Sequence, residues 1–138
     1  MALKLDYEFS YQTQPTVPLR ITHGTMSAET EALLDTGADV SLFDAAVAEL
    51  LNVPFEALDT FRVLGVGGAT SRVPYSWLEA AVVGLPDDQA ATRLAVGFVP
   101  GLAKSVGNLL GRDFLQSFDF GLHHTVAVAR RRLYLGRR

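Results

Sequence analysis

Apolar and polar residues alternate along much of the chain, and this pattern predicts many short strands. Residues 3–12 alternate strictly, with the period of two that is typical of a strand with one buried face. Further extended segments are predicted at residues 17–21, 26–34, 91–99, 118–122 and 126–135. Residues 61–83 are extended on both sides of a glycine-dense tip, which predicts a long hairpin. We therefore expect an all-β domain, built as a closed barrel or sheet.

Helical spacing is restricted to two short segments. Apolar residues recur at helical intervals from Phe43 to Leu51, and Pro54 follows them as a helix terminator. A second short helix is expected from Arg112 to Gln116. No repeat, low-complexity segment or linker divides the sequence, so residues 1–138 are expected to form a single domain.

Composition and charge narrow the functional classes. Hydrophobic residues make up 49% of the 138 residues and charged residues 20%, a balance typical of a globular domain. The net charge of −3 does not favour nucleic acid, and the basic run Arg130–Arg132 is expected to be a solvated strand face. The absence of cysteine excludes disulfides and a Cys nucleophile. No apolar run reaches the ~18 residues of a membrane span, so we expect a soluble cytoplasmic protein without a membrane partner.

The most informative chemistry lies where a predicted strand ends. Asp35 directly follows the apolar residues 32–34, so we expect its carboxylate at the edge of the core, partly removed from water. Such a carboxylate is a candidate general acid or base. Gly37 permits a tight turn, and the hydroxyl of Thr36 can both donate and accept hydrogen bonds. The same three residues are also compatible with an ordinary Asx-type turn.

Three segments, in this order, resemble the motifs of a known family. Residues 32–38 resemble the active-site motif of the aspartic peptidases, and residues 63–68 resemble the flap of retroviral proteases. Residues 108–115 resemble the second signature of those proteases, in which two apolar residues and a glycine precede a short helix. Across roughly residues 28–136 the chain resembles the retropepsin-like aspartic peptidases, including bacterial members. The resemblance implies a closed β-barrel with a glycine-tipped flap and one or two short helices.

The resemblance also implies a role for each matching residue. Asp35 is the expected catalytic carboxylate, Thr36 is expected to bond its counterpart across a dimer, and Gly37 is expected to present its carbonyl to the substrate. The residues expected to contact substrate are Ala38, Asp39, Val40, Gly65, Val66, Gly67 and Gly68. The residues expected to support the catalytic turn are Leu109, Leu110, Gly111 and Arg112, the last through a pairing with Asp39.

The chain contains one Asp-Thr-Gly triplet, and this count determines the expected assembly. Peptide hydrolysis by this route needs two carboxylates that share a proton. A homodimer with a two-fold axis through the site would supply the second carboxylate. We therefore expect an aspartic endopeptidase that acts on a peptide or protein substrate without a cofactor. The alternative is a catalytically inactive dimeric domain of the same fold that binds peptides or serves as a scaffold.

Two other candidate sites are weaker. The glycine-dense tip, residues 65–68, lacks the following helix and the Gly-Lys-Ser/Thr ending of a phosphate loop. His23, His123 and His124 have no accompanying acid or cysteine cluster at ligand spacing, so no metal site is expected.

Overall fold

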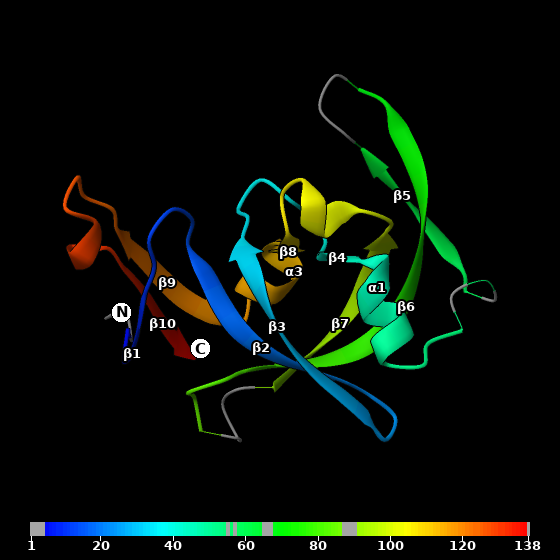
Figure 1. Ribbon diagram of the computed structural model, residues 1–138, viewed down its shortest axis with the longest axis horizontal. Helices are drawn as coiled ribbons and strands as arrows, with labels where there is room; N and C mark the ends of the chain where they lie inside the picture. Colours follow the sequence, from blue (N-terminus) through cyan, green and yellow to red (C-terminus); the bar gives the residue numbers. More distant parts are fainter. Residues whose placement is uncertain (1–4, 55, 57, 65–67, 87–90, 138) are drawn as a thin grey trace.

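The computed structural model describes residues 5–54, 56, 58–64, 68–86 and 91–137, and within them strands dominate (Figure 1). The strands are β1 (Tyr7–Ser10), β2 (Thr16–His23), β3 (Met26–Leu34), β4 (Leu42–Asp44), β5 (Thr60–Leu64), β6 (Thr70–Val82), β7 (Ala91–Val99), β8 (Asn108–Leu110), β9 (Phe118–His123) and β10 (Arg132–Arg137). The helices are α1 (Ala45–Leu50) and α3 (Arg112–Leu115), with short 3₁₀ turns at Leu102–Lys104 and Val128–Arg130. The predicted all-β class is confirmed. No helix in this part of the chain has the length and apolar character needed to cross a membrane.

Six strands close into a barrel. Their order is β2-β3-β8-β4-β7-β6, and the pairing of β2 with β6 completes the ring. The short strand β8 lies between β3 and β4, parallel to the first and antiparallel to the second. The barrel interior and the face of α3 are filled with fully buried side chains, among them Leu19, Ile21, Phe43, Leu78, Leu94, Phe98, Leu110 and Phe114. Burial of these apolar side chains is the main favourable contribution to folding.

The helix predicted from Phe43 to Leu51 is shorter than expected. Residues 42–44 instead form β4, which pairs in parallel with β7 and places Phe43 opposite Phe98 in the core. Because this pairing fully buries Phe43, tertiary contacts prevail over its helical spacing. The helix begins after Asp44, whose side chain accepts a hydrogen bond from the N–H of Ala46 at 2.9 Å.

A second, three-stranded sheet with the order β1-β10-β9 lies beside the barrel (Figure 1). Both its ladders are antiparallel, and the first joins the two ends of the chain, with Tyr7 opposite Leu135. The strand predicted at residues 126–135 begins later in the structure, at Arg132, because residues 124–131 form a loop that includes a 3₁₀ turn. The Arg131 side chain holds that loop by donating from Nε to the Thr125 carbonyl at 2.8 Å. The basic run, residues 130–132, was expected to be a solvated strand face, but Arg132 forms an ion pair with Glu8 at 3.0 Å.

The predicted hairpin is present as β5 and β6, paired from Thr60–Pro74 to Leu64–Thr70. In Figure 1 it rises from the same end of the barrel as the turn that follows β3. Its base is anchored by Phe61, which stacks on Tyr75 with ring centroids 5.1 Å apart. A Cβ atom on Gly97 would lie 2.8 Å from the Phe61 ring, so β7 leaves room for this aromatic contact by carrying no side chain there.

Candidate active site

The turn after β3 holds Asp35 through backbone hydrogen bonds on both sides. Its N–H donates to the Leu110 carbonyl of β8 at 2.9 Å, which extends the β3–β8 ladder by one bond. Its Oδ1 accepts from the N–H of Gly37 at 2.9 Å, and its carbonyl accepts from Ala38 at 3.3 Å. Asp35 is partly buried, as expected, whereas Thr36 and Gly37 are exposed. The carboxylate therefore lies in a fixed orientation at an open face of the domain.

The turn rests directly on the backbone where β8 leads into α3. The N–H of Arg112 donates to the Ala38 carbonyl at 2.8 Å. A Cβ atom added to Gly111 would lie 2.6 Å from the Val40 carbonyl oxygen and 2.8 Å from that of Ala38. Leu110 is completely buried below, and Leu109 is partly buried in the ladder. The absence of a side chain at Gly111 is thus what lets the two backbone segments meet.

Arg112 spans the turn from its outer side. One guanidinium nitrogen donates to the Thr36 carbonyl at 2.9 Å, and the other pairs with the Asp39 carboxylate. The expected pairing of Arg112 with Asp39 is present. Because the two side chains are 55% and 81% exposed, the ion pair adds little stability. Its consequence is geometric, since one rigid guanidinium bridges both ends of the exposed turn.

Sequence reasoning missed a buried polar connection behind the turn. Ser41 is completely buried, and its Oγ donates to Asp113 Oδ1 at 2.8 Å while its N–H donates to Oδ2 at 3.1 Å. The Ser41 Oγ in turn accepts from the N–H of Gly111 at 3.1 Å. Asp113 stands in the first turn of α3, where an acidic residue is common for helix reasons alone. Nothing local in the sequence indicates a partner 72 positions away.

A second polar connection joins β3, β4 and β8. Asn108 is buried; its Oδ1 accepts from the Asp44 N–H at 2.8 Å, and its Nδ2 donates to Thr30 Oγ1 at 2.9 Å. The Asp44 carboxylate accepts from the N–H of Ala46 and from that of Ala103, at 2.9 and 2.7 Å. These two hydrogen bonds, followed by the charge of nearby Lys104, lower the pKa of Asp44 below its ordinary value. The strands around the Asp35 turn are therefore linked by side chains as well as by backbone ladders.

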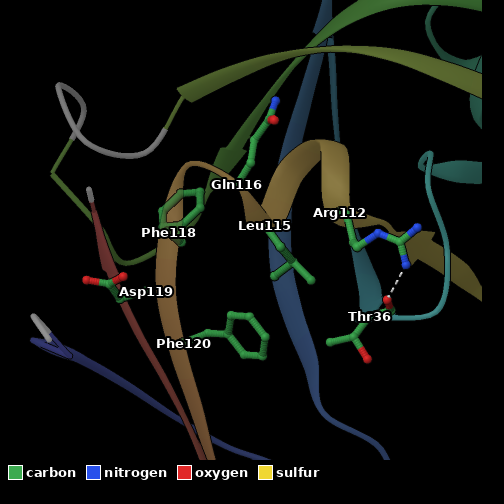
Figure 2. A pocket seen from close by; sticks show the side chains of 7 residues that line it. All are labelled: Thr36, Arg112, Leu115, Gln116, Phe118, Asp119 and Phe120. Atoms are coloured by element: carbon green, nitrogen blue, oxygen red, sulfur yellow. Dashed lines mark hydrogen bonds between the residues drawn. The ribbon is translucent and has the colours of Figure 1, made fainter.

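A mostly apolar groove of about 410 Å³ adjoins the Asp35 turn. It is lined by Thr36, Arg112, Leu115, Gln116, Phe118, Asp119 and Phe120. Figure 2 shows the Phe120 and Leu115 side chains pointing into the space between β9 and Thr36. The groove was not anticipated from the sequence, because its walls come from the turn at Thr36 and from residues 112–120, which are distant along the chain.

The expected substrate contacts are only partly described. Ala38, Asp39 and Val40 lie on the turn beside Asp35, with Asp39 the most exposed of the three. At the hairpin tip, Gly68 has a φ of +85°, the left-handed conformation that a glycine turn uses. Gly65, Val66 and Gly67 lie outside the described residues, so their contact with substrate stays a prediction.

Among the described residues, no group of three or more His, Cys, Asp or Glu side chains could hold a metal ion. His124 instead forms a hydrogen bond between its Nδ1 and Tyr11 Oη at 2.8 Å. The ring of His124 also stacks on that of Tyr11, which ties the loop after β9 to the segment after β1.

Comparison with known proteins agrees with this geometry. The model of the retroviral aspartyl protease family matches residues 11–123. The match spans the Asp35 turn, the β5–β6 hairpin and the β8–α3 junction, and it covers most of the chain. A search of curated proteins found no match. Because the family match extends over well more than half of the sequence, the chain belongs to the retroviral aspartyl protease family.

Proposed function

We propose that this protein is an aspartic endopeptidase in which Asp35 and its counterpart in a second copy of the chain together activate a water molecule. The observation that carries the proposal is the catalytic turn itself. Asp35 is presented at an open face, fixed by the Gly37 N–H and by the β8 backbone. A carboxylate that serves as acid or base must be held in position before substrate arrives, and this turn provides that rigidity.

The chemistry needs two carboxylates that hold one proton between them. Two like charges a few ångströms apart cannot both ionise, so one group stays charged while the other keeps its proton. The charged carboxylate removes a proton from water as the water oxygen attacks the peptide carbonyl carbon. The protonated carboxyl gives its proton to the carbonyl oxygen. When the C–N bond breaks, the first carboxyl gives the proton it took from water to the leaving amine. The second takes a proton back from a hydroxyl of the tetrahedral intermediate, so the pair returns to its starting state.

The remaining parts of the site suit an extended peptide. A substrate bound as an added strand would exchange backbone hydrogen bonds with the turn residues 37–39 and with the hairpin. Side-chain selection would fall to the neighbours of the turn, where Val40 is partly buried and Asp39 is exposed. The β5–β6 hairpin would close over the peptide and exclude water from the reacting bond.

The decisive experiment is product analysis of a peptide library by mass spectrometry at mildly acidic pH. The wild type is compared with Asp35→Asn, Asp35→Ala and a matched control, Asp6→Asn, which changes an exposed aspartate elsewhere. We expect the two Asp35 variants to lose cleavage by roughly 10²- to 10⁴-fold or more, and the control to cleave normally. A statine-type mimic of the transition state should block the wild type.

The same experiment tests the alternative of a dimeric peptide-binding or scaffold domain. Such a domain would release no products from the wild type, and it would bind the same peptides after Asp35→Ala. Products that are identical in the wild type and Asp35→Ala would also contradict the proposal, because they would come from a contaminating protease or from another site rather than from this turn.

A further inference from the structure

Arg137, at the end of β10, connects the three-stranded sheet to the barrel. It lies opposite Phe118 of β9, and its guanidinium carbon is 5.0 Å from the centre of the Phe118 ring. One guanidinium nitrogen donates to Thr92 Oγ1 at 3.0 Å, and the other donates to the Ala91 carbonyl at 3.4 Å. Because both acceptors belong to the start of β7, a single side chain links β9 and β10 to a barrel strand.

The ring beneath this guanidinium belongs to an aromatic pair that reaches α3. Phe118 is 1% exposed and stacks on the completely buried Phe114 of α3, with ring centroids 4.7 Å apart. A guanidinium is attracted to the face of an aromatic ring, more strongly where both groups are withdrawn from water. Phe118 also borders the apolar groove that has Thr36 on its other side (Figure 2). The Phe118 ring therefore links Arg137 both to the helix and to the surroundings of the Asp35 turn.

The helix at the other end of this stack carries the support of the Asp35 turn. Its first residue, Arg112, donates its N–H to the Ala38 carbonyl at 2.8 Å, and Asp113 accepts two hydrogen bonds from the segment after the turn. α3 packs against β9 and also against β7, the strand to which the guanidinium is bound. A displacement of α3 would therefore displace the backbone on which the turn rests.

We propose that Arg137 is a positioning residue for the Asp35 turn and acts on it through Phe118 and α3. The catalytic consequence rests on the proposed function, in which Asp35 is the reacting carboxylate. A misplacement of about 1 Å, caused by a change far from the chemistry, can cost about 10²-fold in rate. The sharing of one proton between two carboxylates also depends on their separation, so a displaced turn should alter the pH dependence of cleavage as well as its rate.

The chain offers a matched control for this arginine. The guanidinium carbon of Arg93 lies 5.2 Å from the centre of the Trp77 ring, a comparable contact, but Arg93 is exposed and Trp77 is 53% exposed. Arg93 directly follows Thr92 on β7, and successive side chains of a strand point to opposite faces. Arg93→Met therefore removes an arginine–aromatic contact from the same strand and leaves the connection to α3 intact.

The first experiment compares the peptide cleavage of Arg137→Met and Arg137→Lys with that of the wild type and Arg93→Met. Methionine removes the charge and the donors, whereas lysine keeps the charge without the planar guanidinium. Rates are divided by the folded fraction from circular dichroism. In Arg137→Met we expect kcat about tenfold lower, KM within about twofold of the wild type and a shifted pH–rate profile. Arg137→Lys should be intermediate, and Arg93→Met should match the wild type.

Two further variants locate the route of the effect. If Arg137 acts through the Phe118 ring, Arg137→Met should lower kcat by less than about twofold when Phe118→Leu is already present. A full tenfold loss in that background would overturn the proposed route. Thr92→Val removes one of the two hydrogen bonds of the guanidinium and should lower kcat in the same direction but less. It gives the same comparison if Arg137→Met does not fold.

Amide hydrogen exchange, followed by NMR, tests the positioning without relying on catalysis. The N–H groups of Asp35 and Arg112 each donate to a backbone carbonyl, at 2.9 and 2.8 Å, and both bonds hold the turn. In Arg137→Met their exchange should be about tenfold faster than in the wild type. The N–H of Val83, which donates to a carbonyl of β2 at 3.0 Å, should exchange at the rate of the wild type.

The outcomes distinguish this proposal from the proposed function. Faster exchange confined to the turn, in a protein whose wild type releases no peptide products, supports the positioning role and contradicts the peptidase. A wild type that cleaves peptides, with kcat, pH profile and exchange unchanged in Arg137→Met, overturns the positioning role and leaves the peptidase standing. Exchange that is equally faster at Val83 and at the turn, with kcat per folded molecule unchanged, shows that Arg137 only stabilises the fold and also overturns the proposal.

Discussion

The buried hydrogen bonds between Ser41 and Asp113 allow a quantitative test of how the Asp35 turn is supported. Replacing Asp113 by alanine removes the acceptor of both the N–H and the Oγ–H of Ser41, which is completely buried. Leaving a buried donor without a partner costs about 1–3 kcal/mol. For two donors we take about 3 kcal/mol, because Asp113 is itself partly exposed and water can reach one of them. A protein of this size loses about 4 °C in melting temperature per kcal/mol, so the expected drop is about 12 °C.

The assay is thermal and urea unfolding of a double-mutant cycle that contains Asp113→Ala, Ser41→Ala and the double variant. Because the two residues share hydrogen bonds, we expect their effects to be non-additive by about 1–2 kcal/mol. Asp113→Asn serves as the conservative control, since its amide oxygen can still accept one bond, and it should lose less stability than Asp113→Ala. The reasoning is refuted if Asp113→Ala melts within about 2 °C of the wild type, or if the two single effects simply add.

Two further predictions concern the floor of the turn and the start of α1. Gly111→Ala should destabilise the fold by about 1–3 kcal/mol and reduce peptide cleavage, because its Cβ would displace the Val40 carbonyl. The free energy of unfolding is compared with that of Gly121→Ala, where the added Cβ makes only an ordinary van der Waals contact. Asp44→Asn should lose the bond to Ala103, and its stability deficit should shrink as pH falls below about 3.8. The folded-state pKa of Asp44 lies below the unfolded value, so its carboxylate stabilises the fold above that value and stops doing so as pH falls through the folded pKa. A deficit that stays constant from pH 7 to pH 2 would contradict this.

The parts of the site that could be predicted from the sequence are those encoded by local patterns. The apolar run before Asp35 predicts a buried strand that ends at a carboxylate, and β3 ends one residue before Asp35. The alternating segments around the glycine-dense tip predict the β5–β6 hairpin, and the two strands pair as expected. The motif that starts at Asn108 also places Arg112 beside Asp39 once the resemblance is applied. In each case the information lies within a few neighbouring residues.

The features that were not predicted depend on partners that are distant in the sequence. β8 has only three residues, too few to show a period of two, and it forms because Leu109 fits between Leu33 and Leu42. Phe43 follows the spacing of a helix but lies in β4, because the pairing with β7 completes the barrel. Likewise, the position of β9 at one edge of its sheet in the described part of the chain follows from its pairing with β10.

The insertion of β8 between β3 and β4 also explains how the site divides into a rigid part and a movable part. β8 pairs with the strand before the Asp35 turn and with the strand after it, and its Leu110 carbonyl accepts a hydrogen bond from the Asp35 N–H at 2.9 Å. A shift of the turn would therefore break bonds on both sides at once. β5, in contrast, pairs with β6 alone in the described part of the chain, and a two-stranded hairpin is marginal without further packing. The Phe61–Tyr75 stack holds it at the base. On the proposed function, opening for a substrate should consequently occur in the hairpin, while Asp35 keeps its position.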